Sequence, residues 1–526
     1  MATRVVGSVT AAVLSATLLL VTSRSLPMTW DEANAILRAL VLVEWTELWG
    51  QENTQPLEAD TIAQYWQYTT VFEGHPAFYA MVISTGVWLA PPMSPLDCGR
   101  FGPIVLFAVA SGALFYRLDK QYSLMAAGCA VLAMLLLPRL FAHAHFAFVD
   151  SPLTSCWVLA WATFAPATKD WRFAVPWGVT LGMAMSCKAT GWITPLPFIV
   201  WVGIYRDRIA IRSLMIGLIL ALATFVALNP PLWHSPIAGV QTFLQLNARR
   251  EYNVPTVFLG QDYDLYHPLP WYNTLFWIGV TVPLGTLLLV CCGVWAILRN
   301  GFRDAAGILV LGHWLILVVV RALPMAPPHD GIRLFLPSFP FLAVVAGVGA
   351  NWLARNAAGK LVRWRTTAIA LLMLGSASSW YWYQPHGLSY YNLLIGGLPG
   401  AVRRGMEPTY YWDGLDRSVT DWLARNTRYD EKVKFTALPE ENLSLMRSFG
   451  LLDVEYRAEA PGRYRWYVLQ RRPSTLSAAD RWLIRHHDAA FQKRIRPNGW
   501  GPWRLDTPLV EVYAFEQHLE SLAAVQ

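Results

Sequence analysis

The apolar run VVGSVTAAVLSATLLLV at residues 5–21 is followed at residues 28–32 by Met-Thr-Trp-Asp-Glu, so two adjacent carboxylates stand just beyond a hydrophobic segment. The run is long enough for a membrane span, and its position also suits a secretion signal. No cleavage site of small residues precedes the acidic pair, so we interpret the run as the first span. Asp31 and Glu32 are therefore expected at a membrane surface.

The composition excludes an ordinary soluble globule. Hydrophobic residues make up 55% of the 526 positions, charged residues only 15%, and the mean hydropathy is +0.33. The basic excess is modest and lies in short connections between apolar runs, which membrane topology explains and nucleic-acid binding does not. The six cysteines lie in or beside apolar runs without metal-ligand or redox spacing, so we interpret them as small core residues. The chain is predicted to be a polytopic α-helical membrane protein without a nucleic-acid partner.

Ten further apolar runs are long enough to span a bilayer. Short basic connections, such as those at 117–120 and 299–303, are expected in the cytoplasm by the positive-inside rule. The longer aromatic segments at 28–100, 141–151, 230–271 and 323–333 then share the outer face. About eleven transmembrane helices result, with the N-terminus cytoplasmic. The ten runs begin near Phe101, Tyr122, Pro152, Phe173, Gly191, Ser213, Tyr272, Ala305, Leu334 and Thr366.

The segment at 76–90 is also apolar enough to be counted as a span. Counting it would place Asp31 and Asp150 on opposite faces of the membrane. Because the basic connections fix the side of everything from Phe101 onward, we expect 76–90 to lie in the outer interface or to re-enter from it.

The composition changes after Tyr383, and residues 389–526 carry an ordinary density of charge. We predict a transmembrane domain over residues 1–388 and a small extracytoplasmic α/β soluble domain over residues 389–526. The aromatic stretch at 410–414 is interpreted as a strand or turn rather than as the Trp-Trp-Asp signature of oligosaccharyltransferases. Helices are expected near 416–426, 439–450 and 477–487, and strands at 433–437, 464–470 and 509–515.

Asp31 and Glu32 are candidate catalytic residues. Two like charges held close together disfavour full ionisation, which leaves one carboxylate able to accept a proton near neutrality. The alternative is that they form the acidic first turn of an interfacial helix running from Ala33 to Leu48, where carboxylates complement the helix dipole.

A second outer loop carries His143, His145 and Asp150. Asp150, followed by Ser151 and Pro152, is expected to cap the next span. The two histidines are at i and i+2 and do not share a helix face, so we interpret them as hydrogen-bonding loop residues rather than metal ligands.

Three basic side chains stand at the same predicted face. Lys188 lies at the outer end of the fifth span, where an ammonium is costly unless it snorkels or pairs. Arg333 opens the tenth span, and its guanidinium suits a lipid-linked phosphate. His75 opens the predicted interfacial helix.

Candidate substrate or metal contacts are Glu73, His143, His145, His267 and Tyr272. Tyr272 lies in an aromatic belt at a span entrance. The sequence has no dedicated metal motif. Glu73, His75 and His267 are the residues that would surround a divalent cation, and no other cofactor is indicated.

These pieces resemble the GT-C superfamily of polytopic glycosyltransferases, in the branch of protein O-mannosyltransferases and aminoarabinose transferases. The resemblance covers residues 1–385. It rests on the Asp31-Glu32 pair, Asp150, the turn that holds Lys188, and two short motifs. These motifs are Glu-Gly-His-Pro at 73–76 and Arg-Leu-Phe-Leu-Pro-Ser-Phe-Pro at 333–340, which looks like the family's Arg-x-x-Leu-Pro-x-x-Pro pattern.

The resemblance implies transfer of a hexosyl or pentosyl group from a polyprenyl-phosphate donor to a protein, lipid or glycan acceptor on the outer face. Asp31 would be the base, with Glu32 beside it and Asp150 positioning a substrate. Arg333 and Lys188 would neutralise the leaving phosphate, with His75 where some relatives have a basic residue. On this interpretation Asp31→Asn, Glu32→Gln and Arg333→Ala each abolish transfer.

The alternative function is a multi-pass transporter or flippase for a lipid-linked or small solute. Transporters usually combine paired repeats with broken helices at the midplane, whereas the charges here cluster at one face beside an added outer domain. We therefore favour the enzyme. The expected location is a bacterial inner membrane, with the ER membrane as the alternative.

Overall fold

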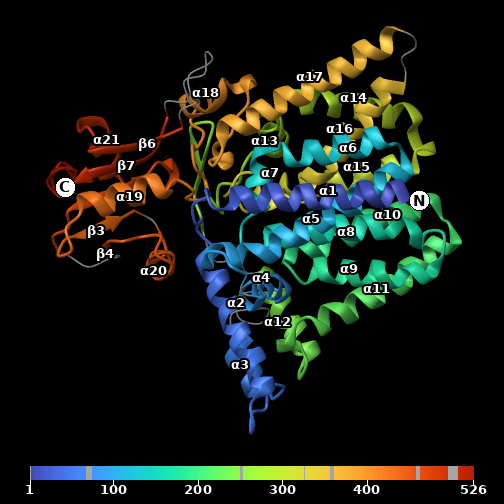
Figure 1. The fold of residues 1–526 in the computed structure, drawn as a ribbon, viewed down its shortest axis with the longest axis horizontal. Coiled ribbons are helices and arrows are strands. Elements are labelled where there is room, and N and C mark those ends of the chain that lie inside the picture. Colours follow the sequence, from blue (N-terminus) through green and yellow to red (C-terminus); the bar gives the residue numbers. More distant parts are fainter. Residues whose placement is uncertain are drawn as a thin grey trace.

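The structure is a computed structural model that describes residues 2–66, 74–89, 91–248, 253–324, 326–355, 360–436, 438–457, 462–495 and 507–525. Its long helices lie side by side, and a small sheet domain formed by the C-terminal part of the chain lies at one end of them (Figure 1). The two termini lie at opposite ends of the molecule (Figure 1).

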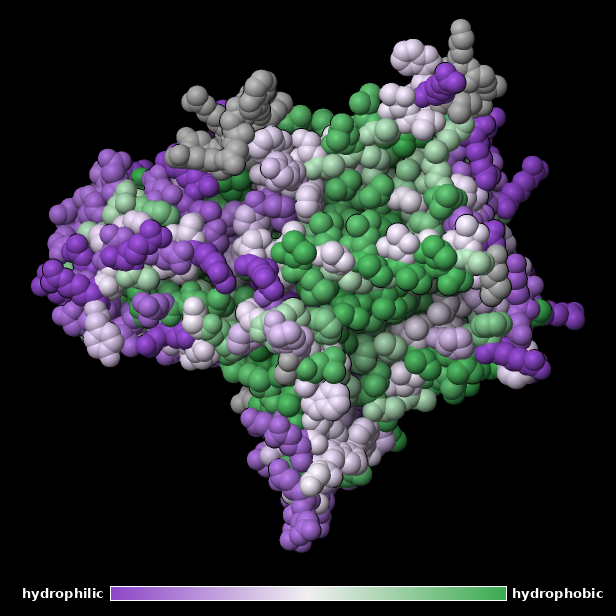
Figure 2. All heavy atoms as spheres, viewed as in Figure 1, coloured by the Kyte–Doolittle hydropathy of each residue, from purple (hydrophilic) through white to green (hydrophobic). Residues whose placement is uncertain are grey.

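Four helices are long and apolar enough to cross a membrane: α1 (Ala2–Ser23), α5 (Pro95–Gln121), α11 (Arg208–Ala227) and the helical segment Leu284–Arg303 that contains α14. Hydrophobic residues cover the middle of the helical part, while hydrophilic residues gather on the sheet domain and at the opposite edge (Figure 2). This banding is the surface that a bilayer requires. The chain therefore has a polytopic membrane fold, and the number of eleven spans stays a prediction.

Two predicted spans are broken near one end. The span expected from Tyr272 consists of α13 (Asn273–Thr281) and α14 (Leu284–Asn300), separated at Pro283. The span expected near Tyr122 consists of α6 (Leu124–Leu135) and the short α7 (Pro138–His143). Proline cannot continue a hydrogen-bonded helix, which explains both breaks. The other helices of this part are α8 (Asp150–Ala167), α9 (Ala174–Met185), α10 (Pro195–Tyr205), α12 (Pro236–Ala248), α15 (Ala305–Arg321), α16 (Ser338–Arg355) and α17 (Lys360–Tyr383).

The segment predicted to stay in the interface forms α4 (Phe78–Leu89). It has 12 residues, as have α6 and α9, so its length does not separate it from the helices counted as spans, and its place in the interface stays a prediction. Glycines let α4 and α5 touch backbone to backbone, because a Cβ on Gly102 would lie 1.8 Å from the carbonyl oxygen of Val82. The neighbouring α2 (Glu32–Glu47) and α3 (Ala59–Trp66) project sideways from the bundle (Figure 1).

The C-terminal part contains a five-stranded sheet in the order β4-β3-β5-β7-β6. Strands β4, β3 and β5 are parallel, and β5, β7 and β6 are antiparallel. The predicted strands correspond to β3 (Lys432–Phe435), β5 (Trp466–Gln470) and β7 (Pro508–Ala514). The predicted helices correspond to α19 (Arg417–Asn426), α20 (Glu440–Ser448) and α21 (Ala478–His486).

Two strands and two α-helices of this part were not predicted: β4 (Glu455–Arg457), β6 (Phe491–Arg494), the short helix α18 (Gly397–Arg403) and the terminal helix α22 (Phe515–Ala523). The two strands are short and carry charged residues, so they have little of the alternating hydrophobicity by which strands are recognised.

Candidate active site

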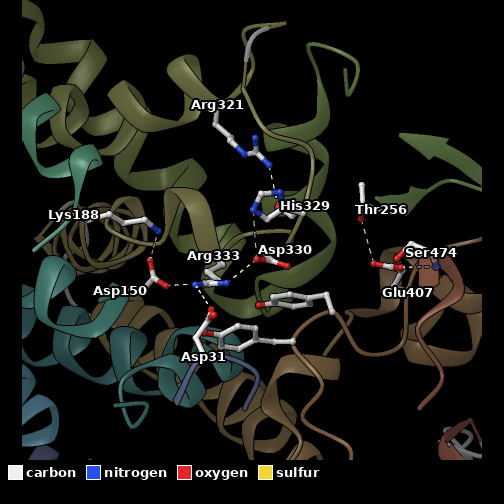
Figure 3. Close-up of polar contacts among 12 residues, drawn as sticks. Asp31, Asp150, Lys188, Thr256, Arg321, His329, Asp330, Arg333, Glu407 and Ser474 are labelled. Carbon is white, nitrogen blue, oxygen red and sulfur yellow. Dashed lines mark hydrogen bonds and ion pairs between the residues drawn. The ribbon is translucent and has the colours of Figure 1, made fainter. Parts of the chain in front are cut away.

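One guanidinium holds three carboxylates at the end of the helical bundle nearest the sheet domain. Nη2 of Arg333 lies 2.7 Å from Oδ2 of Asp31, Nε lies 2.7 Å from Oδ2 of Asp150, and Nη1 lies 2.7 Å from Oδ2 of Asp330 (Figure 3). The Arg333 side chain is buried. We call Asp31, Asp150, Lys188, Asp330 and Arg333 the arginine cluster.

Every member of the arginine cluster stands at or beside a helix end. Asp31 precedes α2, and Asp150 is the first residue of α8. Lys188 follows α9, and Arg333 opens the 3₁₀ turn η6 (Arg333–Phe335) ahead of α16. Asp330 has a left-handed backbone with φ of 63°, which aspartate tolerates better than most residues. The structure thus brings together residues that lie far apart in the sequence.

Asp150 pairs with two cations instead of capping its helix. Its Oδ1 lies 2.8 Å from Nζ of Lys188, while Oδ2 contacts Arg333, and no side-chain cap bond forms at this helix start. The prediction of an N-cap was wrong because two cationic partners are available to this carboxylate. Lys188 likewise pairs rather than snorkels, which removes the cost of an unpaired buried ammonium.

Asp31 is the most solvent-accessible carboxylate of the arginine cluster. Its side chain is 25% exposed, against 5% for Asp150 and 7% for Asp330. The hydroxyl of Tyr411 also donates to Oδ2 of Asp31, at 2.8 Å. Among the described residues, Oδ1 of Asp31 accepts no hydrogen bond, so this oxygen is the one that can meet a substrate.

Aromatic rings enclose the guanidinium of Arg333. Its carbon lies 4.9 Å from the centre of the Phe148 ring and 4.3 Å from that of Tyr411. Both distances are typical of cation–π contacts, which strengthen when water is excluded.

Asp330 links the arginine cluster to the C-terminal part. Burial alone would raise the pKa of Asp330, but the charges of His329, Arg333 and Arg472 outweigh burial and lower that pKa below its usual value. Nη2 of Arg472 lies 3.6 Å from Oδ1 of Asp330, and Nε of Arg472 lies 3.7 Å from the carboxylate of Glu407. Arg472 is fully buried, so these charges interact without screening by water.

Glu32 does not join Asp31. Its side chain is completely buried and forms a bidentate pair with Arg100, at 2.8 Å and 2.7 Å. The same carboxylate accepts from the backbone N–H groups of Thr29 and Ala147, while Arg100 also donates to the carbonyls of Ser23, Leu26 and Pro27. The expected shared charge of Asp31 and Glu32 is wrong, because each carboxylate has its own cation.

The two histidines of the second outer loop are buried structural residues. Nε2 of His143 lies 3.0 Å from the hydroxyl of Tyr410. His145 lies 2.7 Å from the carbonyl of Phe141 and 2.9 Å from Oγ1 of Thr22. Burial, with the positive charge of Arg100, lowers the pKa of His145 to about 4, so this ring is neutral at physiological pH.

The remaining predicted contacts lie outside the arginine cluster. His75 packs against Phe148, with ring centres 6.3 Å apart. Phe148 also contacts the guanidinium of Arg333. His267 bonds Asp264 at 3.0 Å and is well exposed, and Tyr272 packs near Phe258.

Glu73 lies outside the described residues. Over the described part of the chain, no three His, Cys, Asp or Glu side chains are arranged to hold a metal ion. The divalent cation therefore stays a prediction.

Sequence reasoning missed Tyr411, Asp330 and Arg472. Asp330 had a local signal, because it stands three residues before Arg333 in a short loop between helices. Tyr411 lies in the aromatic stretch at 410–414 that was interpreted as a strand or turn, and Arg472 had no local signal. Both come to the arginine cluster from the C-terminal part, and each pairs with residues far away in the sequence.

The fold and the site together define a class of protein: a polytopic membrane protein with a charged, partly open centre at the helix ends that face a small α/β domain. Comparison with protein-family models and with curated proteins found no match.

Among solved structures, ArnT from Cupriavidus metallidurans in the apo state matches with a TM-score of 0.50 and 14% identity, over 97% of this chain and 99% of that one. ArnT bound to undecaprenyl phosphate matches with a TM-score of 0.47 and 13% identity, over 96% and 98% of the two chains. The archaeal oligosaccharyltransferase AglB from Archaeoglobus fulgidus, in complex with an inhibitory peptide and a dolichol-phosphate, matches at 0.46 and 10%, over 88% and 69%.

The match to apo ArnT extends over nearly the whole of both chains. The chain therefore shares the fold of ArnT, and this agrees with the predicted resemblance at the level of the fold.

Proposed function

We propose that this protein is an integral-membrane glycosyltransferase that moves a sugar from a polyprenyl-phosphate donor to an acceptor at the outer face of the membrane. Asp31 is the base, and Arg333 and Lys188 stabilise the leaving phosphate. The observation that carries the proposal is the contact of Arg333 with both Asp31 and Asp150, because it sets a proton acceptor beside two cations.

The chemistry follows from these positions. Asp31 accepts the proton of the acceptor hydroxyl as the acceptor oxygen bonds to the anomeric carbon of the sugar. The bond from that carbon to the phosphate oxygen breaks, and the polyprenyl phosphate leaves with the electron pair. Stabilising the charge that develops on the leaving group is the main demand of such a reaction, and preorganised cations in a dry site meet it.

Arg333 retains donors for this role. A guanidinium has five N–H groups, and three of those on Arg333 bond to aspartates. One N–H on each terminal nitrogen has no partner among the residues that the structure describes, and two such groups match the bidentate geometry of a phosphate.

The arrangement favours the enzyme over the transporter. Two helices are broken, as transporters often show, but the charges stand at helix ends beside the C-terminal domain and not midway along the bundle.

The proposal also includes the domain bounds, the membrane topology, the host membrane and the acceptor. They comprise the transmembrane domain over residues 1–388 with about eleven spans, a cytoplasmic N-terminus, and the extracytoplasmic domain over residues 389–526. They also comprise a bacterial inner membrane and a protein, lipid or glycan acceptor.

Purified protein incubated with a panel of polyprenyl-phosphate sugars, including mannosyl and pentosyl donors, tests the proposal through donor consumption. We expect at least one donor to be consumed by the wild-type protein and none by Arg333→Ala. Movement of intact donor between the leaflets of a vesicle, without consumption, would instead support the flippase.

A further inference from the structure

We propose that Tyr411, from the C-terminal part of the chain, is a positioning residue of the transfer site that holds the carboxylate of Asp31 in its working orientation. This inference rests on the proposed function, since it assigns a role in the same reaction. It makes the soluble part of the chain a component of the active site.

Tyr411 contacts both charged partners of the reaction. Its hydroxyl donates to Oδ2 of Asp31 at 2.8 Å, and its ring lies 4.3 Å from the guanidinium carbon of Arg333. Its backbone also joins the same segment, because its carbonyl oxygen accepts from the N–H of Trp30 at 3.4 Å. Burial raises the pKa of Tyr411 well above its ordinary value, so the hydroxyl keeps its proton and donates throughout the physiological range.

The residues around Tyr411 fix it firmly. Nη1 of Arg472 donates to the carbonyl of Tyr410 at 2.8 Å, and the guanidinium of Arg472 lies 3.9 Å from the ring centre of Trp412. Trp412 in turn packs on Trp30 at 4.1 Å and has a left-handed backbone, with φ of 55°. A bulky residue holds this conformation only where its surroundings determine it, and such positions gather at functional sites.

The two oxygens of Asp31 consequently have different roles. Arg333 and Tyr411 both donate to Oδ2, which fixes the plane of the carboxylate. Oδ1 accepts nothing from the described residues and is left to receive the acceptor's proton. Without the tyrosine hydroxyl, Asp31 pivots about its single contact with Arg333, and the near-attack geometry is populated less.

Tyr411→Phe tests the role, because it removes the hydroxyl and keeps the ring on Arg333. We expect kcat to fall about 10- to 100-fold, as for loss of a hydrogen bond to a charged group, with the KM for donor within about threefold. The acid limb of the pH–rate profile should move to higher pH, because the ionised carboxylate loses a donor.

Tyr410→Phe is the matched comparison. Tyr410 is equally buried and stands in the same segment, but its hydroxyl meets His143 instead of Asp31. A loss caused by disturbed packing affects both variants and lowers both melting temperatures. The shifted acid limb is expected in Tyr411→Phe alone, and the exposed Tyr429→Phe should match wild type.

A readout that needs no turnover separates this inference from the proposed function. Labelling of Asp31 with a carbodiimide, followed across pH by mass spectrometry, reports when this carboxylate ionises. If the wild type consumes no donor, the proposed function fails, and a labelling profile that moves to higher pH in Tyr411→Phe alone still supports positioning by Tyr411. Identical labelling and pH–rate profiles in wild type, Tyr410→Phe and Tyr411→Phe overturn the inference, as do equal losses in both variants.

Discussion

Asp31 and Glu32 are neighbours in the sequence, yet they end in two different environments. Asp31 shares Arg333 with two other aspartates, is 25% exposed and keeps one oxygen open. Glu32 is fully buried against Arg100. Both of its carboxylate oxygens accept hydrogen bonds from donors of the surrounding chain. Under the proposed function Asp31 takes part in the chemistry, and Glu32 anchors the backbone that carries it.

The difference shows how the site is built. The pair of Glu32 and Arg100 ties residues 23–32 to the first turns of α5 through buried hydrogen bonds. In the arginine cluster, by contrast, Arg333 has N–H groups without a partner among the described residues, and the carboxylate of Asp31 is accessible. Precise catalysis requires reactive groups with free hydrogen-bonding positions to be supported by rigidly held neighbours.

The largest effect is expected from Arg333→Ala, which removes the cation common to Asp31, Asp150 and Asp330. Transfer should fall by about 10³-fold or more, because the leaving phosphate loses its main partner and three carboxylates lose theirs. Donor consumption by purified protein measures this. Arg333→Lys, which keeps the charge without the planar fork, should recover only part of the loss, and full recovery would contradict the bidentate role.

Next in size is the effect of Glu32→Gln on stability, and here the structure revises the sequence-based expectation that transfer is abolished. Uncoupling Arg100 should lower the free energy of unfolding by about 3–5 kcal/mol, since a buried charge loses its partner. The double variant Glu32→Met/Arg100→Met should recover much of this stability. Thermal unfolding in detergent measures both, and activity per folded molecule should stay close to wild type in Glu32→Gln. Loss of transfer without loss of stability would place Glu32 in the chemistry instead.

Asp330→Asn should have a smaller effect on activity. It keeps the shape of the side chain and weakens the contacts with Arg333 and Arg472. We expect kcat/KM to fall about 10-fold, equivalent to about 1.4 kcal/mol, because Arg333 loses one of three anchors. Steady-state kinetics over a range of donor concentrations give the value, and an unchanged kcat/KM would show that Asp31 and Asp150 suffice.

The smallest effect concerns His145, which packs beside the Glu32 anchor. Its pKa is lowered from 6.5 to about 4 in the folded state, so the unfolded chain binds a proton between these values and the folded chain does not. Stability is therefore lost as pH falls through this window, by about 1–2 kcal/mol between pH 7 and pH 5 for this one residue. In His145→Gln, the drop in melting temperature from pH 7 to pH 5 should be smaller than in wild type. An equal drop would assign the acid sensitivity to other groups.

Much of this fold could be predicted from sequence because membrane physics is restrictive. Hydropathy predicted the apolar helices α5 and α11, while the interfacial place of α4 stays a prediction. In the C-terminal part, β5 and β7 were strongly apolar, while β6 reads Phe-Gln-Lys-Arg and carries no such pattern.

The site was predictable only in part. Asp31, Asp150 and Arg333 were found because charged residues are scarce in this chain and each is costly to bury. Their partners were not, since Arg100 lies within an apolar helix and Tyr411 meets Asp31 across 380 positions. Sequence adjacency suggested that Asp31 and Glu32 act together. Successive residues at the start of a helix point in different directions, and the two carboxylates accordingly found different cations.

The most direct test of the account compares Asp31→Asn with Glu32→Gln in one experiment. Transfer from a labelled polyprenyl-phosphate sugar is measured with equal amounts of folded protein in the same detergent. We predict a loss of about 10²- to 10⁴-fold for Asp31→Asn and a near-normal rate for Glu32→Gln. Transfer by Asp31→Asn at the wild-type rate, or equal losses in both variants, would contradict the account.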